Sequence, residues 1–241
     1  MLETIILLTA GATQQFALSE LLRQHNPALS FRGALTLDDL AAIPLAELRN
    51  ARLVAFTTAV IVPQRILDAL GHGAYNFHPG PPHYPGWAPA HFALYDGART
   101  FGATAHAMAA RVDCGPIVGV EAFAVPDQVS VRELEQIAFI RLAYLFWRMA
   151  RDIANEPGPL PELPIAWSGV KSTRRMYQEL CDIPPGVDAG ELRRRIRAFD
   201  DDFRAIPLTI SLHGIRFRLA VADAGKAETP RVEAPPIAIA S

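Results

Sequence analysis

Apolar β-type runs alternate with helical stripes along this chain, and the alternation restricts the folds it can adopt. Residues 4–9 (TIILLT) form a continuous β-rich apolar run, typical of a strand that is buried on both faces. A helical stripe over 13–25 follows it. Further strands are predicted at 29–35, 53–58, 73–78, 101–108 and 117–123, with short helices at 63–70 and 88–96. This order predicts an α/β fold with a mostly parallel sheet.

The C-terminal third has a different character. Ser130 and Glu133 form a capping box at the start of a long helix that is predicted to reach about residue 155. A Pro-rich linker (EPGPLPELP) occupies 156–164, and arginine becomes frequent after it. We therefore predict a main domain over 1–155 and a small α+β subdomain over 156–223. The subdomain is predicted to hold a basic helix at 191–199 and a hairpin at 208–219, and a disordered Pro/Ala-rich tail at 224–241 follows it.

Composition excludes several classes of protein. The 241 residues are 50% hydrophobic, which is ample for a core, and the formal net charge of −2 gives no net basic field to attract nucleic acid. Two cysteines do not make a disulfide framework, so a reducing compartment is the simpler interpretation. The N-terminus lacks the basic region of a signal peptide, and its apolar run is too short to span a bilayer. We expect a cytoplasmic protein with no membrane partner.

Three polar residues, Asn76, His78 and Asp113, stand beside Pro or Gly in an otherwise apolar segment. Asn76 and His78 end one predicted strand and Asp113 ends a second β-run, and open α/β sheets bind ligands beyond such strand ends. The Asn amide can donate to an oxyanion, His78 points to the same side, and the carboxylate can raise the His pKa or position a water. The set suits direct acyl transfer to an amine, since no Ser or Thr is placed as a nucleophile. The same residues could equally be turn formers.

Other chemistry has weaker support in the sequence. His78, His83, His106 and Asp113 can ligate metal but lack the spacing of metal motifs, so no metal is expected. No base is placed to activate Cys114. Residues 10–13 (AGAT) lack the second glycine of a phosphate loop, which favours a plain β–α turn. The arginines over 193–197 could contact a nucleotide, but the acidic residues at 200–202 offset their field, and a solvated face with internal ion pairs is favoured.

Three ordered blocks carry a resemblance to a known family. Residues 76–79 (NFHP), 102–106 (GATAH) and 112–117 (VDCGPI), spaced by Gly86, Pro89 and Gly97, resemble the folate-dependent formyltransferase family. Its members include glycinamide ribonucleotide, methionyl-tRNA and sugar-nucleotide formyltransferases and formyltetrahydrofolate hydrolase. The resemblance covers about residues 1–150. It implies a Rossmann-like domain that transfers the formyl group of 10-formyltetrahydrofolate to an amine.

The resemblance also implies roles for individual residues. Asn76 would hydrogen-bond the formyl oxygen, His78 would stabilise the oxyanion or accept the amine proton, and Asp113 would position His78 and a water. His106 matches a commonly occupied family position and need not be catalytic. The residues expected to flank the folate are Tyr75, Phe77, Arg111, Val112, Cys114 and Gly115. The candidates for acceptor contact are His83, Tyr84, Trp87 and Arg197.

The loop that faces the acceptor in this family differs here. Residues 79–86 read PGPPHYPG instead of the usual Pro-Ser-Leu-Leu-Pro pattern, and the phosphate loop of the glycinamide ribonucleotide enzymes is missing. Because the subdomain is short for a tRNA-binding barrel, we predict an amino sugar nucleotide or a related small amine as acceptor, with tRNA disfavoured. A methionyl-tRNA acceptor, hydrolysis of formyltetrahydrofolate and folate binding without catalysis remain alternatives. The hairpin at 208–219 offers an edge for a homodimer.

Overall fold

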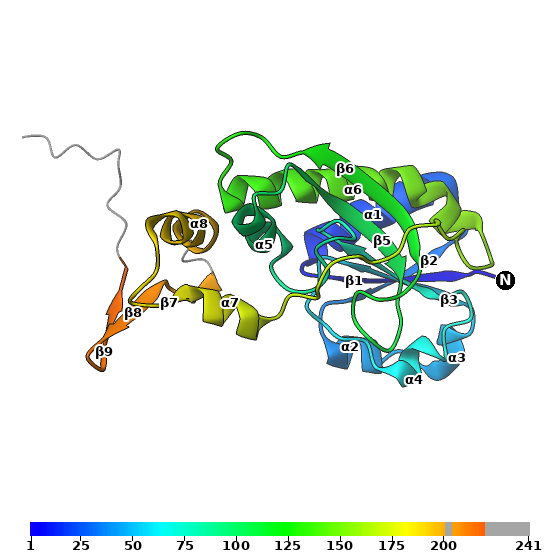
Figure 1. Ribbon diagram of the computed structural model, residues 1–241. Helices are drawn as coiled ribbons and strands as arrows, with labels where there is room; N and C mark the ends of the chain where they lie inside the picture. The colour runs from blue at the N-terminus through cyan, green and yellow to red at the C-terminus, as the bar shows by residue number, and fades with distance from the viewer. Residues whose placement is uncertain (201–203, 220–241) are drawn as a thin grey trace, which may run out of the picture.

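A six-stranded sheet forms the centre of the computed structural model, which describes residues 1–200 and 204–219 (Figure 1). Its strand order is β2-β1-β3-β4-β5-β6. The strands are β1 (Thr4–Thr9), β2 (Ser30–Ala34), β3 (Ala51–Phe56), β4 (Ala74–His78), β5 (Thr100–Ala107) and β6 (Ile117–Ala124). The first four pair in parallel, and β5 is antiparallel to both of its neighbours. The predicted mostly parallel α/β sheet is confirmed.

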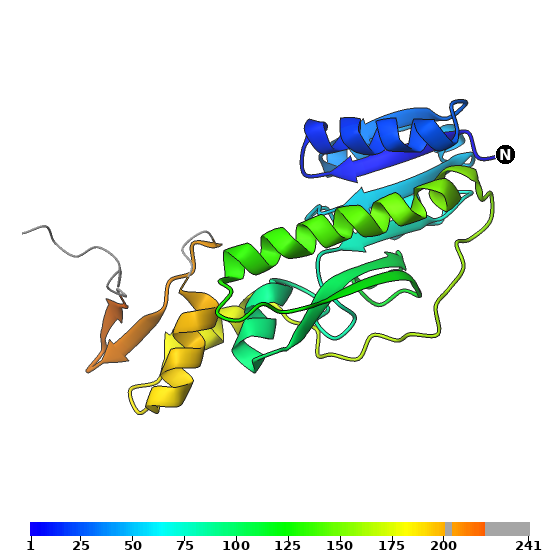
Figure 2. The same ribbon diagram turned by 90° about the horizontal axis from the view of Figure 1, so that it is seen from above.

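Helices cover both faces of this sheet. The long helices α1 (Ala12–His25) and α6 (Val131–Asn155) lie on one face, as Figure 2 shows from above. The short helices α2 (Leu37–Ala41), α3 (Leu45–Leu48) and α4 (Gln64–Leu67) lie on the other (Figure 1). Because side chains alternate along a strand, Tyr75 and Phe77 of β4 enter the core beside α6, while Asn76 and His78 face the opposite side. This alternation separates packing residues from site residues within five positions of one strand.

Local capping explains where several helices begin and end. The predicted box at the start of α6 is present, with Ser130 Oγ accepting from Glu133 N and the Glu133 carboxylate accepting from Ser130 N. Helix α5 (Pro89–Asp96) is closed by Gly97 at φ 70°, a left-handed conformation that favours glycine. The predicted helix over 63–70 is shorter than expected, since α4 covers only Gln64–Leu67. Helices α2 and α3 were not predicted, because one helical turn carries no readable period.

The Pro-rich linker is fastened to the body of the protein. Leu160 is buried, and its N–H donates to the Tyr75 hydroxyl at 2.8 Å. Arg52 is fully buried at the amino end of β3, and it donates to main-chain carbonyl oxygens of three chain segments. These acceptors are the carbonyls of His72, Asp152, Ile153, Glu156 and Gly158. One guanidinium thus holds the end of α6 and the start of the linker together.

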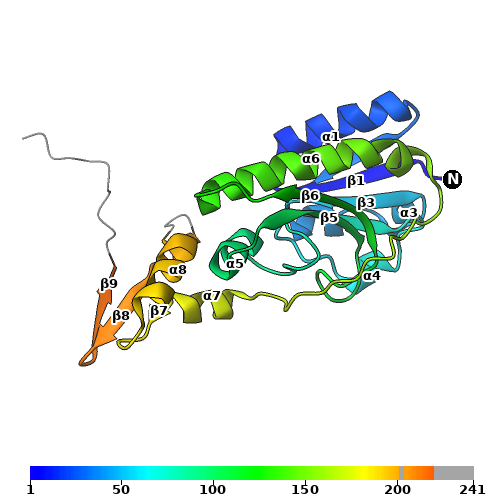
Figure 3. The same cartoon turned by 45° about the horizontal axis from the view of Figure 1, so that its top comes forward.

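A second sheet, with strand order β7-β8-β9, lies beyond the linker (Figure 3). Helix α7 (Arg174–Cys181), β7 (Asp182–Ile183), helix α8 (Ala189–Phe199), β8 (Thr209–Leu212) and β9 (Ile215–Arg218) make up this part. The predicted hairpin and basic helix are confirmed, whereas α7 and β7 were not predicted. Aromatic residues of α5, α7 and α8 share one core, and the domain boundary at residue 155 stays a prediction. The tail predicted at 224–241 lies outside the described residues.

Two properties of the described residues bear on function. No helix within 1–200 and 204–219 is both long and apolar enough to cross a bilayer. The same residues contain no group of three or more His, Cys, Asp or Glu side chains that could hold a metal ion.

Candidate active site

The pairing of β4 with β5 brings Asn76 opposite His106. Asn76 Nδ2 lies 3.1 Å from His106 Nε2, and His106 Nδ1 lies 2.9 Å from the carbonyl oxygen of Ala107. Because a carbonyl only accepts, we assign the ring proton to Nδ1, and Nε2 then accepts from the Asn76 amide. One amide proton of Asn76 is thereby bound, and the second is available to donate to a ligand. The sequence identified Asn76 as a site residue, but its contact with His106 was not predicted.

Asp113 reaches the same place from a loop, not from a strand end as predicted. Strand β5 ends at Ala107, and Asp113 has φ 51°, a left-handed conformation that costs on the order of 1 kcal/mol in a non-glycine residue. As the loop returns, Gly115 passes close to the Ala107 carbonyl. A Cβ at position 115 would lie 1.9 Å from the carbonyl oxygen of Ala107. Asp113 Oδ2 accepts from Gly86 N at 2.9 Å, which holds the loop in this conformation.

The carboxylate of Asp113 faces both histidines. Its Oδ2 lies 3.8 Å from His78 Nδ1 and its Oδ1 lies 3.4 Å from His106 Nε2. All three side chains are nearly excluded from solvent, at 6% exposed for His78, 2% for His106 and 5% for Asp113. At this depth their electrostatic interactions are stronger than in water. The structure therefore brings the three predicted catalytic residues together and adds His106 to them.

Burial decides the protonation states in this cluster. It lowers the pKa of His78, and the opposing charge of Asp113 offsets only part of that effect, so the expected rise in the His78 pKa does not occur. Burial acts to raise the pKa of Asp113, but the nearby imidazoles of His106 and His78 and the hydrogen bond from Gly86 N–H outweigh it and hold this pKa below its usual value. At neutral pH the site therefore contains a neutral His78 beside an ionised Asp113, which is the state a general base requires.

A cavity of about 400 Å³ opens onto these residues. Two apolar segments, 59–62 after β3 and 108–110 after β5, form much of its wall. The polar part of its lining comprises Thr58, Asn76, His78, His106, Arg111, Asp113, Lys171 and Ser172. Segment 59–62 was missed in the sequence, although its place after a parallel strand end could have indicated it. Nothing in the local sequence indicated Lys171 or Ser172.

Only some of the predicted folate contacts lie at the cavity. Arg111 and Val112 line it. Cys114 is exposed beside it, with Sγ donating to the Arg111 carbonyl, and the Gly115 carbonyl accepts from Trp167 Nε1. The side chains of Tyr75 and Phe77 do not reach the cavity, because strand alternation buries them in the core against α6. For these two residues, only main-chain groups remain available for the predicted contact.

The predicted acceptor contacts are also divided. Trp87 lines the cavity, and the Tyr84 carbonyl lies 3.3 Å from His78 Nε2. The Tyr84 ring packs toward Phe101 and is partly buried, and this burial raises its pKa to about 12 with help from Asp96. His83 Nδ1 lies 3.3 Å from Ser168 Oγ, outside the cavity lining.

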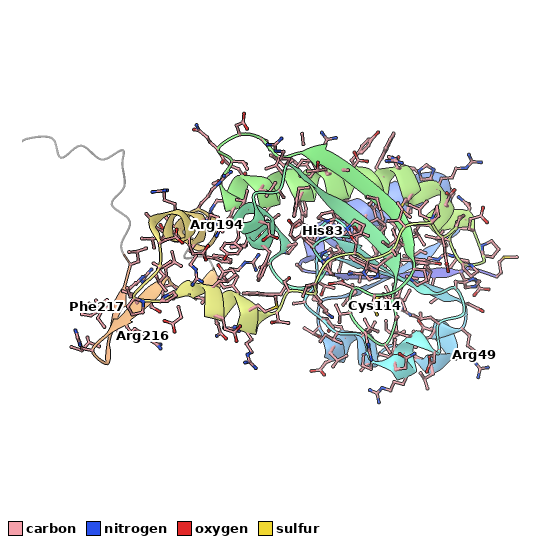
Figure 4. All side chains as sticks on the ribbon, viewed as in Figure 1. Arg49, His83, Cys114, Arg194, Arg216 and Phe217 are labelled. Atoms are coloured by element: carbon pink, nitrogen blue, oxygen red, sulfur yellow. The ribbon has the colours of Figure 1, made fainter. Side chains whose placement is uncertain are left out.

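Arg197 does not line the cavity. It borders a separate hollow with Gly97, Arg99 and Val125, because α8 packs on the far side of α5. The internal ion pairs predicted for the basic helix are present, since Arg194 and Arg195 both bind Glu191. Figure 4 shows Arg194 on α8 well separated from Cys114 in the loop after β5.

Residues 167–172, which we call the strap, tie the two site loops together. Ser172 Oγ donates to the Trp87 carbonyl at 2.6 Å, and Trp87 N donates back to the Ser172 carbonyl at 3.0 Å. Gly86, at φ 97°, lies so close that a Cβ would be 2.3 Å from that carbonyl oxygen. Lys171 Nζ donates to the Val112 carbonyl at 2.8 Å. The strap thus joins loop 79–87 to loop 108–116 across the site.

Fold and site together define a Rossmann-like α/β domain with a buried acid–base cluster at the ends of its strands. Residues 42–139 match the family model for formyl transferase. This region is a formyl transferase domain.

Relatives agree with this assignment. The methionyl-tRNA formyltransferase of Dinoroseobacter shibae is 31% identical over 142 residues, which are 58% of this chain and 46% of that protein. The match thus spans about half the length of that curated relative. A sugar N-formyltransferase from Shewanella sp FDAARGOS_354 has the same fold, with a TM-score of 0.75 at 13% identity, covering 92% of this chain and 98% of that one. The N-formyltransferase from Helicobacter canadensis, solved with folinic acid and dTDP-3-aminofucose, gives a TM-score of 0.61 at 16% identity over 89% and 85% of the chains.

Proposed function

We propose that this protein transfers the formyl group of 10-formyltetrahydrofolate directly to a primary amine of a small molecule, an amino sugar nucleotide. The observation that carries the proposal is the convergence of Asn76, His78 and Asp113 on one cavity from β4 and a distant loop. The formyl transferase domain supports the reaction class, and the relative solved with folinic acid supports the donor. In this proposal Asn76, His78 and Asp113 are the catalytic residues.

The reaction follows from the protonation states of the site. The acceptor nitrogen attacks the formyl carbon to form a C–N bond. The second N–H of Asn76 Nδ2 donates a hydrogen bond to the oxygen that becomes negative. Neutral His78 takes a proton from the attacking nitrogen, and the adjacent Asp113 stabilises the resulting imidazolium. The bond from the formyl carbon to N10 then breaks, and N10 receives the proton. No atom or charge is left over, and tetrahydrofolate is the second product.

The lining of the cavity suits the reactive end of a folate. Apolar segments 59–62 and 108–110 present walls on which a flat pterin ring can lie, while Arg111 at the rim can meet a carboxylate. Asn76, His78 and Asp113 supply polar atoms to the same lining, where the formyl group must be polarised.

The identity of the acceptor has weaker support than the reaction class. The Shewanella sugar N-formyltransferase aligns over 98% of its length, the net charge of this chain is −2, and arginines of α8 are engaged with Glu191. These observations favour a small acceptor. The second candidate is methionyl-tRNA, because the curated relatives matched by sequence are methionyl-tRNA formyltransferases.

The test is incubation of the purified protein with 10-formyltetrahydrofolate and, separately, nucleotide-linked 3-amino and 4-amino sugars, methionyl-tRNA, or no acceptor. Mass spectrometry should show one added formyl group on an amino sugar. Asn76→Ala should lower kcat about 10²–10³-fold, as for loss of an oxyanion donor. Asn155→Ala is the matched control, since this exposed amide bonds only within α6.

Each of the other possible results of this experiment would contradict one specific part of the proposal. Formylated methionyl-tRNA would replace the acceptor, and free formate without acceptor would indicate hydrolysis. Folate binding without turnover would exclude catalysis, and full activity of Asn76→Ala would exclude the assigned site.

A further inference from the structure

Trp167 of the strap contacts both histidines of the site from outside the cavity. Its ring centroid lies 5.1 Å from that of His106 and 6.0 Å from that of His78, at interplanar angles of 84° and 73°. Its Nε1 donates to the Gly115 carbonyl at 2.9 Å, which fixes the indole against loop 108–116. Trp167 is not among the residues that line the cavity. The two imidazoles therefore have the cavity on one side and an indole edge-on at another.

Several other elements also contribute neighbours to His78. Loop 79–87 contributes the Tyr84 carbonyl, loop 108–116 contributes Asp113, and β5 contributes His106. Trp167 adds an edge-on contact from the linker after α6. The near-complete burial of His78 thus depends in part on a residue far away in the sequence.

We propose that Trp167 is a positioning residue of this site, whose indole closes the linker side of the His78–His106 pair against water and so maintains His78 as a neutral base. The site and its geometry are independent of the reaction, while the role as a base rests on the proposed function. Exclusion of water is the property through which a side chain that touches no substrate can act on the chemistry.

The direction of the effect follows from the groups that face His78. Burial lowers its pKa, as do the charges of His106 on β5 and Lys171 on the strap, whereas Asp113 and the Tyr84 carbonyl raise it. Removing the indole admits water and reduces the cost of burying a charged ring, while these partners stay in place. The pKa of His78 must then rise, and a larger fraction of the enzyme would hold it protonated in mildly acidic solution.

The experiment is an NMR titration of the histidine rings in the wild-type protein, Trp167→Ala and Trp167→Phe, with the His78 signal assigned through His78→Gln. The His78 midpoint should move to higher pH in Trp167→Ala and stay near the wild-type value in Trp167→Phe, which keeps an aromatic cover. Trp147→Ala is the matched control, because Trp147 is 57% exposed on α6 and should leave the midpoint unchanged. Trp167→Leu repeats the test, with the same sign, if the alanine variant does not fold.

The titration needs no turnover, so it decides the role of Trp167 even if no formyl transfer is found. An unchanged or lower His78 midpoint in a folded Trp167→Ala or Trp167→Leu protein overturns the proposal. Where activity is present, the acidic limb of kcat/KM should move to higher pH by the same interval as the NMR midpoint. A fall in kcat/KM with an unmoved limb would assign Trp167 a packing role only.

Discussion

Replacement of Arg52 by methionine should destabilise the protein by about 3 kcal/mol. Methionine keeps much of the apolar stem but removes all the donors to five main-chain carbonyls. At about 1 kcal/mol per hydrogen bond the loss is about 5 kcal/mol, and relief of the burial cost of the cation returns up to about half of it. Lysine retains the charge, but its single nitrogen cannot span the end of α6 and the linker at once. Arg52→Lys should therefore lose less stability than Arg52→Met, though still a measurable amount.

Urea unfolding followed by circular dichroism measures this change, and the melting temperature should fall by about 6–12 °C in the methionine variant. Arg49→Met is the control, since Arg49 is exposed at the edge of the molecule, as Figure 4 shows. A loss below about 1 kcal/mol for Arg52→Met, or equal losses at both positions, would refute the idea that this guanidinium fastens the linker.

Three further predictions concern single positions. Gly86→Ala should cost about 2 kcal/mol or more in urea unfolding and reduce activity, because its Cβ would meet the Ser172 main chain and its φ of 97° disfavours any side chain. Burial, assisted by the charge of Arg204, lowers the pKa of His91 to about 3, so between pH 6.5 and 3 only the unfolded chain binds a proton at this ring. The free energy of unfolding should therefore decline as pH falls from 6.5 towards 3. His91→Phe should flatten this slope by up to about 1.4 kcal/mol per pH unit. Exposed Cys114 should react with a disulfide reagent in the native protein, whereas burial raises the pKa of Cys181 to about 12, so Cys181 should react only after unfolding.

Matched variants separate these effects from general damage. Gly186→Ala adds a Cβ with nothing within 4 Å and should be neutral. His25→Phe changes an exposed ring and should leave the acid slope unchanged. If Cys181 reacts as fast as Cys114 in the native protein, the burial of its thiol beside the Ile206 carbonyl is wrong.

The sequence predicted the centre of the sheet well because β1, β3, β4 and β5 are buried along most of their length and read as apolar runs. Asn76 and His78 were visible for the same reason, since polar residues stand out in such a run. Register is not written in local sequence, so the pairing that places His106 against Asn76 could not be foreseen. Asp113 was identified as a site residue but placed on a strand, because β-type residues continue into a loop that only tertiary hydrogen bonds define.

Residues that act from a distance were invisible in the sequence. Arg52 looked like an ordinary residue at the start of a strand, and only the fold shows the carbonyls that surround it. Trp167 and Lys171 follow a Pro-rich segment whose composition indicates a linker, not the wall of a site. Composition describes only the local segment. The hydrogen bonds of Trp167 to Gly115 and of Lys171 to Val112 depend on the tertiary fold, which brings this segment back to the loop after β5.

The strap also sets the order in which the site can be completed during synthesis. Ser172 and Trp87 are 85 positions apart, so their mutual hydrogen bonds close a long loop that includes α5, β5, β6 and α6. A growing chain exposes β4 and the Asp113 loop to solvent well before the strap leaves the ribosome. Until it docks, His78 and His106 lack the outer cover that Trp167 provides. Chemical competence should therefore lag behind formation of the sheet, and a refolding experiment would record it as a late phase, since closing a long loop slows folding.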